Sequence, residues 1–216
     1  VRTRVLELAG KLPNSPFHGL KEDQVEFSQG RLLVAGHPES ARGYAEILRH
    51  SGLSVIQEEV SVMPNLLKQR GHSMCTHSAS FVEVKVDEDL GTIEVTRVVS
   101  AVAAGRILNP KTSRNQILGG VVWGISSALH EKSELDLDLG RFMNHSLSEY
   151  HIPVQADIHD IDVIFVKEHD EIVNPLGIKG VGEIGVVGVA AAVANAVFHA
   201  TGKRVRRLPI RLDDLL

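Results

Sequence analysis

One acidic side chain, Glu183, lies in a glycine-rich segment that could place it against a bound molecule. Segment 174–185 reads NPLGIKGVGEIG, and the small, apolar segment 186–203 follows it. Because glycine has no Cβ atom, such a backbone can pass close to a large ligand. Glu183 is therefore either a first-turn residue that satisfies helix N–H groups or a general base beside a substrate. The local sequence leaves both roles open.

The same segment contains a literal GxGxxG motif, Gly180 to Gly185, which is typical of dinucleotide-binding turns. In that fold the motif follows directly from a strand, but the preceding apolar run ends at Val166. The sequence also has no acidic residue about 20 positions downstream, where such domains bind ribose. We therefore do not expect a dinucleotide site here.

A second candidate is Gln116, on a predicted helix that also carries Gly119, Gly120 and Gly124. Each glycine inside a helix costs about 1 kcal/mol relative to alanine. Three of them indicate that another backbone or a ligand comes close, and helix packing and ligand binding both remain open. The amide of Gln116 has donors and an acceptor that could recognise the polar edge of a heterocycle.

Other reactive residues give weaker signals. The eleven histidines include no HExxH or HxH cluster, and His72 and His77 flank Cys75 at spacings unlike those of zinc sites. No neighbouring feature singles out Cys75 as a nucleophile, and no GxSxG motif occurs. We therefore predict no metal ion bound directly by side chains of this chain.

Composition narrows the class of protein. Hydrophobic content is 43%, charged content is 23% and the net charge is −4, so nucleic acid and anionic membranes are not expected partners. A single cysteine is typical of a reducing compartment. We expect no membrane-spanning stretch and no leader. Because Val1 begins inside a predicted helix, we also expect the chain to be part of something longer.

Hydrophobic periodicity predicts a mixture of helices and strands without regular βαβ alternation, which favours a single α+β domain over 1–216. The expected helices are 1–12, 38–52, about 20 residues after the Asn109-Pro110 cap, and a buried helix over 186–203 that ends at Gly202. The expected strands are two short ones within 24–34, one at 54–62, a hairpin of 78–86 with 91–102, and one at 161–166. Loops are expected at 63–77 and 132–160.

Together these segments resemble the C-terminal part of the molybdenum-binding subunit of the xanthine dehydrogenase and aldehyde oxidoreductase family, the molybdenum hydroxylases. The resemblance covers nearly the whole chain, and the ending GKRVRRLPI is most similar to bacterial enzymes that oxidise aldehydes. It is carried, in the family's order, by SASFVEVKVDEDLGTIEVTRVVSAV, GRILNPKTSRNQILGGVVWGISSALHE, MNHSLSEYHIPVQADIHDIDVIFV and NPLGIKGVGEIGVVGVAAAVANAV.

The resemblance implies a role for each candidate residue. Glu183 corresponds to the base that takes a proton from a molybdenum-bound hydroxyl as its oxygen attacks an aldehyde or N-heterocycle carbon. Gln116 corresponds to a residue that hydrogen-bonds the pterin cofactor. The turn of Lys179, Gly180 and Gly182 corresponds to backbone near the metal. The fold it implies is a cofactor-binding domain that is incomplete by itself.

The resemblance also implies partners. The molybdenum-pterin cofactor, with its cytosine dinucleotide form as one alternative, would be shared with an upstream half of the subunit. Iron–sulfur clusters and FAD would lie on partner subunits, and the substrate would be a small aldehyde or purine. The location would be the cytoplasm, or the periplasm if a partner exports the complex. We expect the isolated chain to be inactive; the alternative is an inactive fragment or assembly module that completes a cofactor site only with another chain.

Overall fold

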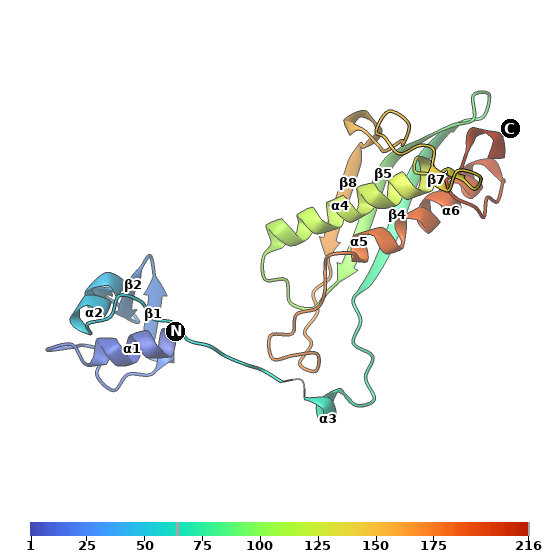
Figure 1. The fold of residues 1–216 in the computed structure, drawn as a ribbon. Coiled ribbons are helices and arrows are strands. Elements are labelled where there is room, and N and C mark those ends of the chain that lie inside the picture. Colours follow the sequence, from blue (N-terminus) through green and yellow to red (C-terminus); the bar gives the residue numbers. More distant parts are fainter. Residues whose placement is uncertain (64, 216) are drawn as a thin grey trace. The chain divides into compact units, whose positions relative to one another are not determined.

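The computed structural model describes residues 1–63 and 65–215, and the chain divides into two compact units (Figure 1). The N-terminal unit is Val1–Met63 and the C-terminal unit is Pro64–Leu216. Each unit has its own hydrophobic core. The sequence predicts one domain over 1–216, and whether both units serve one cofactor-binding domain stays a prediction.

The N-terminal unit packs two helices against a small antiparallel sheet in the order β1-β2-β3. Its core includes the fully buried side chains of Phe17, Leu32 and Ile47. The first helix and the two short strands are as predicted. The elements are α1 (Arg2–Gly10), η1 (Glu22–Gln24), β1 (Val25–Ser28), β2 (Arg31–Val34), β3 (His37–Gly43) and α2 (Tyr44–His50).

Two predictions in this unit are wrong. Residues 37–43 form strand β3 instead of the first half of a helix, because they pair with β2 in a register that sets Gly43 opposite Arg31. The second helix therefore starts only at Tyr44. Residues 54–62, predicted as a strand, have no regular structure, since no strand of the described residues pairs with them. In both cases the outcome depends on whether a partner strand is available and not on local propensity.

The C-terminal unit is built on a sheet in the order β4-β5-β8, with β4 (His77–Asp87), β5 (Thr92–Ala103) and β8 (Asp160–Phe165). The predicted hairpin is the antiparallel pair β4–β5, and β8 lies parallel to β5. Helices α4 (Pro110–Leu129) and α6 (Val189–Thr201) pack on the sheet (Figure 1). This arrangement confirms the α+β class. The remaining elements are α3 (Leu66–Gln69), β6 (Leu135–Asp136), β7 (Arg141–Phe142), η2 (Gln155–Asp157), α5 (Ile184–Val187) and η3 (Leu212–Asp214).

Helix α4 starts as the sequence predicts. The side-chain oxygen of Asn109 accepts hydrogen bonds from the backbone N–H groups of Lys111 (3.1 Å) and Thr112 (3.3 Å), and Pro110 is the first helical residue. An Asn cap and a Pro at the first position both favour a helix start. The helix then runs for 20 residues.

The final helical segment differs from its prediction in two ways. It divides at Gly188 into α5 and α6, and only one face is buried, chiefly by Val189, Val193 and Val197. On the other side, Val187 is 71% exposed. By length and composition alone, Ile184–Thr201 could cross a membrane, although the sequence analysis expects no such stretch. Within this unit the segment packs against α4 and β4 along its buried face.

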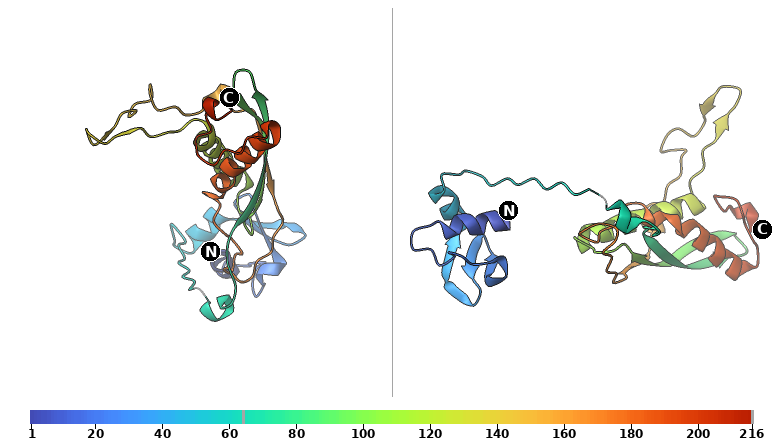
Figure 2. Two further views of the ribbon diagram at one scale, coloured as in Figure 1. Left: turned by 90° about the vertical axis from the view of Figure 1, so that its right-hand side faces the viewer. Right: turned by 90° about the horizontal axis from the view of Figure 1, so that it is seen from below.

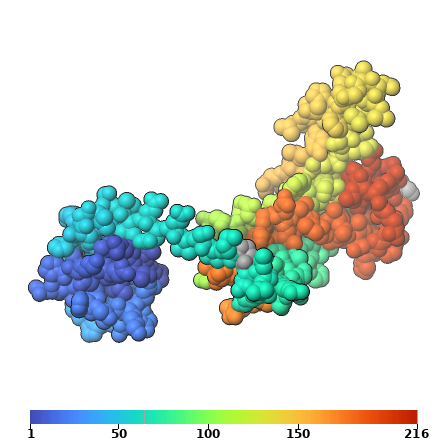
Figure 3. Space-filling model, turned by 60° about the horizontal axis from the view of Figure 1, so that its bottom comes forward, coloured from blue at the N-terminus to red at the C-terminus, as the bar shows by residue number. Residues whose placement is uncertain are grey.

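Residues 131–159 form an arm that projects from the rest of the C-terminal unit (Figure 2; yellow in Figure 3). It contains the two-residue strands β6 and β7 and little other regular structure, as predicted for 132–160. Large apolar side chains on it are exposed, among them Leu137 (84%) and Leu147 (83%). Exposed apolar groups at this density are typical of surfaces that pack against other protein.

Candidate functional site

Glu183 lies immediately before α5, and its side chain is exposed. Its backbone carbonyl accepts a hydrogen bond from the N–H of Val186 at 3.1 Å. Its carboxylate makes no capping hydrogen bond to α5. The role of a first-turn residue that satisfies helix N–H groups therefore does not describe this side chain. Glu183 lines neither of the two hollows described below. A surface that faces its carboxylate would therefore lie outside these two hollows.

The backbones of α4 and α5 meet directly after Glu183. A Cβ atom on Gly185 would lie 2.8 Å from the carbonyl oxygen of Ile117, and one on Gly120 would lie 2.9 Å from the Cα atom of Gly185. One helical turn further along, a Cβ atom on Gly124 would meet the side chain of Val189 at 2.5 Å. Gly120 and Gly124 are thus required for helix packing, which was one of the two explanations that the sequence left open.

Gln116 lies next to this crossing, one residue before Ile117. Its side chain is exposed, and it shares a face of α4 with Gly119 and Trp123, at helical spacings of three and seven residues. A Cβ atom on Gly119 would meet no atom within 4 Å. The structure therefore brings Gln116 and Glu183 to the two elements of one crossing, with an accessible surface beside Gln116.

Gly180 and Gly182 form an open, exposed turn before Glu183. A Cβ atom on either would meet no atom within 4 Å, so neither glycine is required for packing inside this unit. The carbonyl of Gly180 accepts a hydrogen bond from the hydroxyl of Thr76 at 2.8 Å. A hydrogen bond to its backbone thus holds the turn in place, and the open Cβ positions of its two glycines leave space for a bulky group.

Lys179 occupies a different environment from the rest of the turn. Its side chain is only 7% exposed, and its ammonium lies 2.5 Å from Glu168 Oε1 and 3.1 Å from Asp170 Oδ2. The hydrogen bond to Glu168 is the main cause that raises the pKa of Lys179, and the same bond holds the pKa of Glu168 below its usual value. Among the sequence-predicted site residues, Lys179 alone has its charged group paired within the unit.

A polar hollow of about 590 Å³ lies beside these acids. Lys68 and Arg106 bring positive charge to its lining, which also includes Glu168 and Asp170. Glu168 and Asp170 were not predicted from the sequence as site residues, because the run KEHDE has the composition of a solvated loop. The signal that could have indicated them is that two acids and one lysine lie close in the sequence to the glycine turn.

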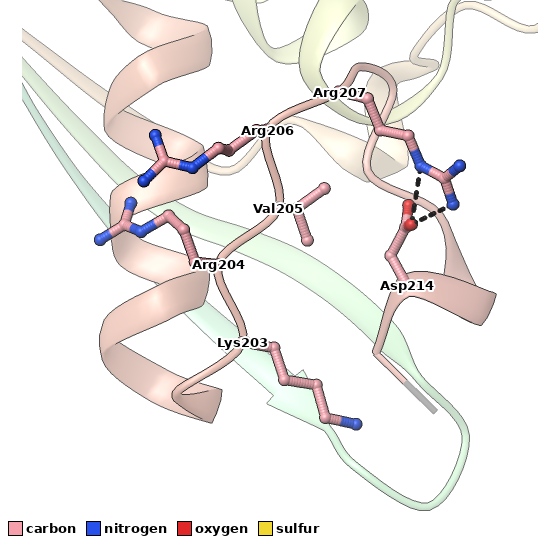
Figure 4. Close-up of a pocket in the computed structure, with 6 residues that line it drawn as sticks. All are labelled: Lys203, Arg204, Val205, Arg206, Arg207 and Asp214. Carbon is pink, nitrogen blue, oxygen red and sulfur yellow. Dashed lines mark hydrogen bonds and ion pairs between the residues drawn. The ribbon is translucent and has the colours of Figure 1, made fainter.

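A second hollow, of about 340 Å³, is lined by the basic residues that follow α6 (Figure 4). Arg207 pairs with Asp214 at 2.5 Å, and the guanidinium of Arg204 lies over the ring of Phe198, 3.7 Å from its centre. The side chain of Lys203 donates to the carbonyl of Leu215. Lys203 and Arg207 therefore bind the chain's last turns to the segment that follows α6.

The remaining reactive residues form no centre in the part of the chain that the structure describes. Within 1–63 and 65–215, no group of three or more His, Cys, Asp and Glu residues could hold a metal ion. Cys75 is exposed, and its sulfur lies 3.4 Å from the hydroxyl of Ser73.

Comparison with known proteins identifies the class. A family described as molybdopterin cofactor-binding domain matches residues 1–159, which include Gln116 but not Glu183. The chain thus belongs to the molybdenum-binding subunits of the xanthine dehydrogenase and aldehyde oxidoreductase family, as a molybdopterin cofactor-binding domain.

Individual relatives extend the likeness over nearly the whole chain. The aldehyde oxidoreductase molybdenum-binding subunit PaoC of Escherichia coli K12 is 40% identical over 201 residues, 92% of this chain. This chain spans only 26% of the length of PaoC.

Solved structures show the same fold. Quinoline 2-oxidoreductase from Pseudomonas putida 86 superposes with a TM-score of 0.70 over 98% of this chain and 27% of its own, at 23% identity. The aldehyde oxidoreductase from Desulfovibrio desulfuricans ATCC 27774 superposes with a TM-score of 0.58 over 65% of this chain and 15% of its own, at 31% identity.

Proposed function

We propose that this chain is the C-terminal part of the subunit that binds molybdenum in a hydroxylase of aldehydes or N-heterocycles, with Glu183 as its general base. The observation that carries the proposal is that the side chain of Glu183 is exposed and, within the described part of the chain, unpaired. Its carboxylate is exposed and has no hydrogen-bond or ion-pair partner among the described residues, yet it follows a turn whose backbone is held at several points. A side chain that contributes nothing to its own unit is available for a ligand.

The turn and the neighbouring helix face suit a large organic cofactor. Gly180, Gly182 and Gly119 are open where a Cβ atom would stand, so backbone and ligand can approach closely. The exposed amide of Gln116 can both donate to and accept from a pterin ring. The backbone of Lys179 continues the same turn. When bound, the molybdenum-pterin group would supply oxygen transfer to the substrate carbon and accept two electrons.

In this proposal the chain's own contribution is positioning and proton transfer. Gln116 orients the pterin, and the turn of Gly180 and Gly182 leaves space for the metal end of the cofactor. Glu183 accepts the proton of the hydroxyl that attacks the substrate. Proton transfer by a positioned side chain contributes roughly 10²–10⁴-fold to a rate.

Substrate and partners belong to the whole subunit, of which relatives have about four times this length. Relatives include subunits of an aldehyde oxidoreductase and of a xanthine dehydrogenase, which support aldehydes and N-heterocycles as the substrate classes. We infer an upstream half of the subunit and partner subunits that carry iron–sulfur clusters and FAD. The cofactor would be molybdopterin, with the cytosine dinucleotide form as one alternative. The complex would be cytoplasmic, or periplasmic if a partner exports it.

A second candidate is an inactive assembly module that completes a cofactor site only with another chain. The exposed outer face at Val187 and the apolar arm favour it, because both need further protein to cover them.

Molybdenum and pterin analysis tests the two candidates. We expect little or no molybdenum on the purified 216-residue chain, and stoichiometric molybdenum when the remaining part of the subunit is produced with it. Stoichiometric metal on the isolated chain would contradict the need for a second half. No metal in the reassembled subunit would contradict the proposed function.

A further inference from the structure

An ionic cluster around a nearly buried lysine lies four residues before Glu183. Lys179 is 7% exposed, Glu168 is 28% exposed and Asp170 is 18% exposed, and the ammonium contacts both carboxylates. Few lysines are buried to this extent. Because removing a charge from water costs free energy, loss of one partner from such a pair leaves an uncompensated charge and destabilises the structure around it.

The cluster joins three segments that are distant in the sequence. Glu168 follows β8, and its Oε2 atom accepts a hydrogen bond at 2.7 Å from the N–H of Gly105, two residues after the end of β5. Lys179 begins the glycine turn, and its own N–H donates to the carbonyl of Ala104 at 3.3 Å. Asp170 Oδ1 accepts from the N–H groups of Ile172 and Val173, which shapes the loop between these segments.

Backbone contacts beside the cluster are equally close. The N–H of Arg106 donates to the carbonyl of Gly177 at 2.7 Å, and Gly105 pairs with Ile178 in an antiparallel bridge. Gly105 has a φ of +67°, and a Cβ atom there would lie 2.2 Å from the oxygen of Gly177. The start of the turn is therefore pressed against the end of β5 without room for a side chain.

Glu183 thus lies between two fixed points. One is the ionic cluster at Lys179, and the other is the crossing of Gly185 with α4. Between them, Gly180 and Gly182 make no packing contact through a Cβ position and would be flexible if either end were released. Four residues span at most about 14 Å, so movement at Lys179 reaches Glu183 directly.

We propose that Lys179, held by Glu168 and Asp170, is a positioning residue that fixes the turn on which Glu183 projects. This inference rests on the proposed role of Glu183 as the base. In this proposal the ammonium of Lys179 binds acids of its own unit and does not contact the cofactor. The backbone of Lys179 continues into the turn that faces the cofactor.

The test removes the ammonium and follows the turn itself. In Lys179→Met, two carboxylates remain close together without their cation, and their repulsion should open the contact with the end of β5. Amide hydrogen exchange of the 216-residue chain would report the backbone N–H groups of Arg106 and of position 179. We expect their exchange to become faster by roughly tenfold or more, with the central amides of β5 unchanged. Lys167→Met removes an exposed lysine nearby and is the matched control.

Conservative variants separate positioning from a general loss of folding. Lys179→Arg keeps a cation that can bridge two carboxylates, and it should restore most of the protection. Glu168→Gln keeps the shape and should accelerate exchange even if Lys179→Met does not fold, with exposed Glu171→Gln as its control. Exchange rates unchanged from the wild type in a folded Lys179→Met or Glu168→Gln chain would overturn the proposal.

Activity measurements then distinguish this inference from the proposed function. In the complete molybdenum subunit with its partners, Lys179→Met should lower kcat by on the order of 10²-fold with little change in KM, since misplacing a catalytic group mainly affects the chemical step. An unchanged kcat together with faster exchange would overturn the positioning role. If instead Glu183→Gln keeps full turnover, the base assignment fails, whatever the exchange data show.

Discussion

A Cβ atom on Gly120 in α4 would lie 2.9 Å from the Cα atom of Gly185 in α5. Non-bonded carbon atoms do not pack this closely without movement, and a Cβ atom on Gly185 would be equally close to the carbonyl oxygen of Ile117, so both positions require glycine for the two helices to cross. Its neighbour Gly119 faces open space. The adjacent glycines of α4 therefore have different roles. Gly120 is required for packing against α5, and Gly119 leaves the surface of α4 open to a ligand.

Substitution with alanine should separate these purposes. We expect Gly120→Ala to destabilise the C-terminal unit by about 1–3 kcal/mol, because overpacking forces the helices apart. Gly119→Ala should stabilise the unit by up to about 1 kcal/mol through helix propensity. Urea unfolding of the 216-residue chain, followed by far-UV circular dichroism, measures both. Equal effects of the two substitutions would contradict the crossing.

Gln116 should matter for cofactor retention and not for folding. Gln116→Leu removes the amide from an exposed position, so the free energy of unfolding should change little. Loss of one or two hydrogen bonds of about 1 kcal/mol each should weaken pterin binding roughly tenfold. Pterin content of the reassembled subunit, measured by fluorescence after oxidation, tests this. Asn115→Leu, on another face of α4, is the matched control, and equal losses in both variants would count against a contact at Gln116.

The acidic loop should make stability depend on pH. Hydrogen bonds from the backbone N–H groups of Val173 and Ile172, and then from Lys179, lower the pKa of Asp170 to about 2. A carboxyl whose pKa is depressed in the folded state stabilises the fold above its ordinary value near 3.9, and that contribution is lost as the pH falls through the folded-state value. We expect the free energy of unfolding to decline between about pH 5 and pH 2.

Asp170→Asn should flatten this decline, because the amide does not titrate. Urea unfolding at a series of pH values measures the slope, and Asp89→Asn in the β4–β5 turn serves as the control. The same slope in wild type and Asp170→Asn would show that Asp170 is not the group responsible.

The sequence predicted correctly those elements that are determined by residues within or next to the element itself. The alternation of Phe81 and Val82 onward predicts β4, the Asn109 cap predicts the start of α4, and Gly202 ends α6 with a φ of +74°. Strand β3 could not be predicted in this way, because its structure depends on pairing with β2. The burial of the last helix was overestimated, since composition does not show which faces have neighbours in this chain.

The candidate site divides similarly. Glycine content and one acid indicated Glu183 and its turn from the sequence, and the glycines of one predicted helix indicated Gln116. A resemblance to a known family added the cofactor and the role of each residue toward it. The ion pairs of Lys179 could not be predicted, because Glu168 and Asp170 come from a loop whose path is set by the sheet. Composition alone does not distinguish a buried acid from a solvated one.

The most direct test of the central claim is turnover of the reassembled enzyme carrying Glu183→Gln, measured together with its molybdenum content. The amide keeps the size of the side chain but removes its basicity, so the account predicts a loss of roughly 10²–10⁴-fold or more in kcat with full molybdenum content. Glu88→Gln, on the exposed β4–β5 turn, should keep wild-type turnover. Wild-type turnover in Glu183→Gln at full molybdenum content would contradict the account.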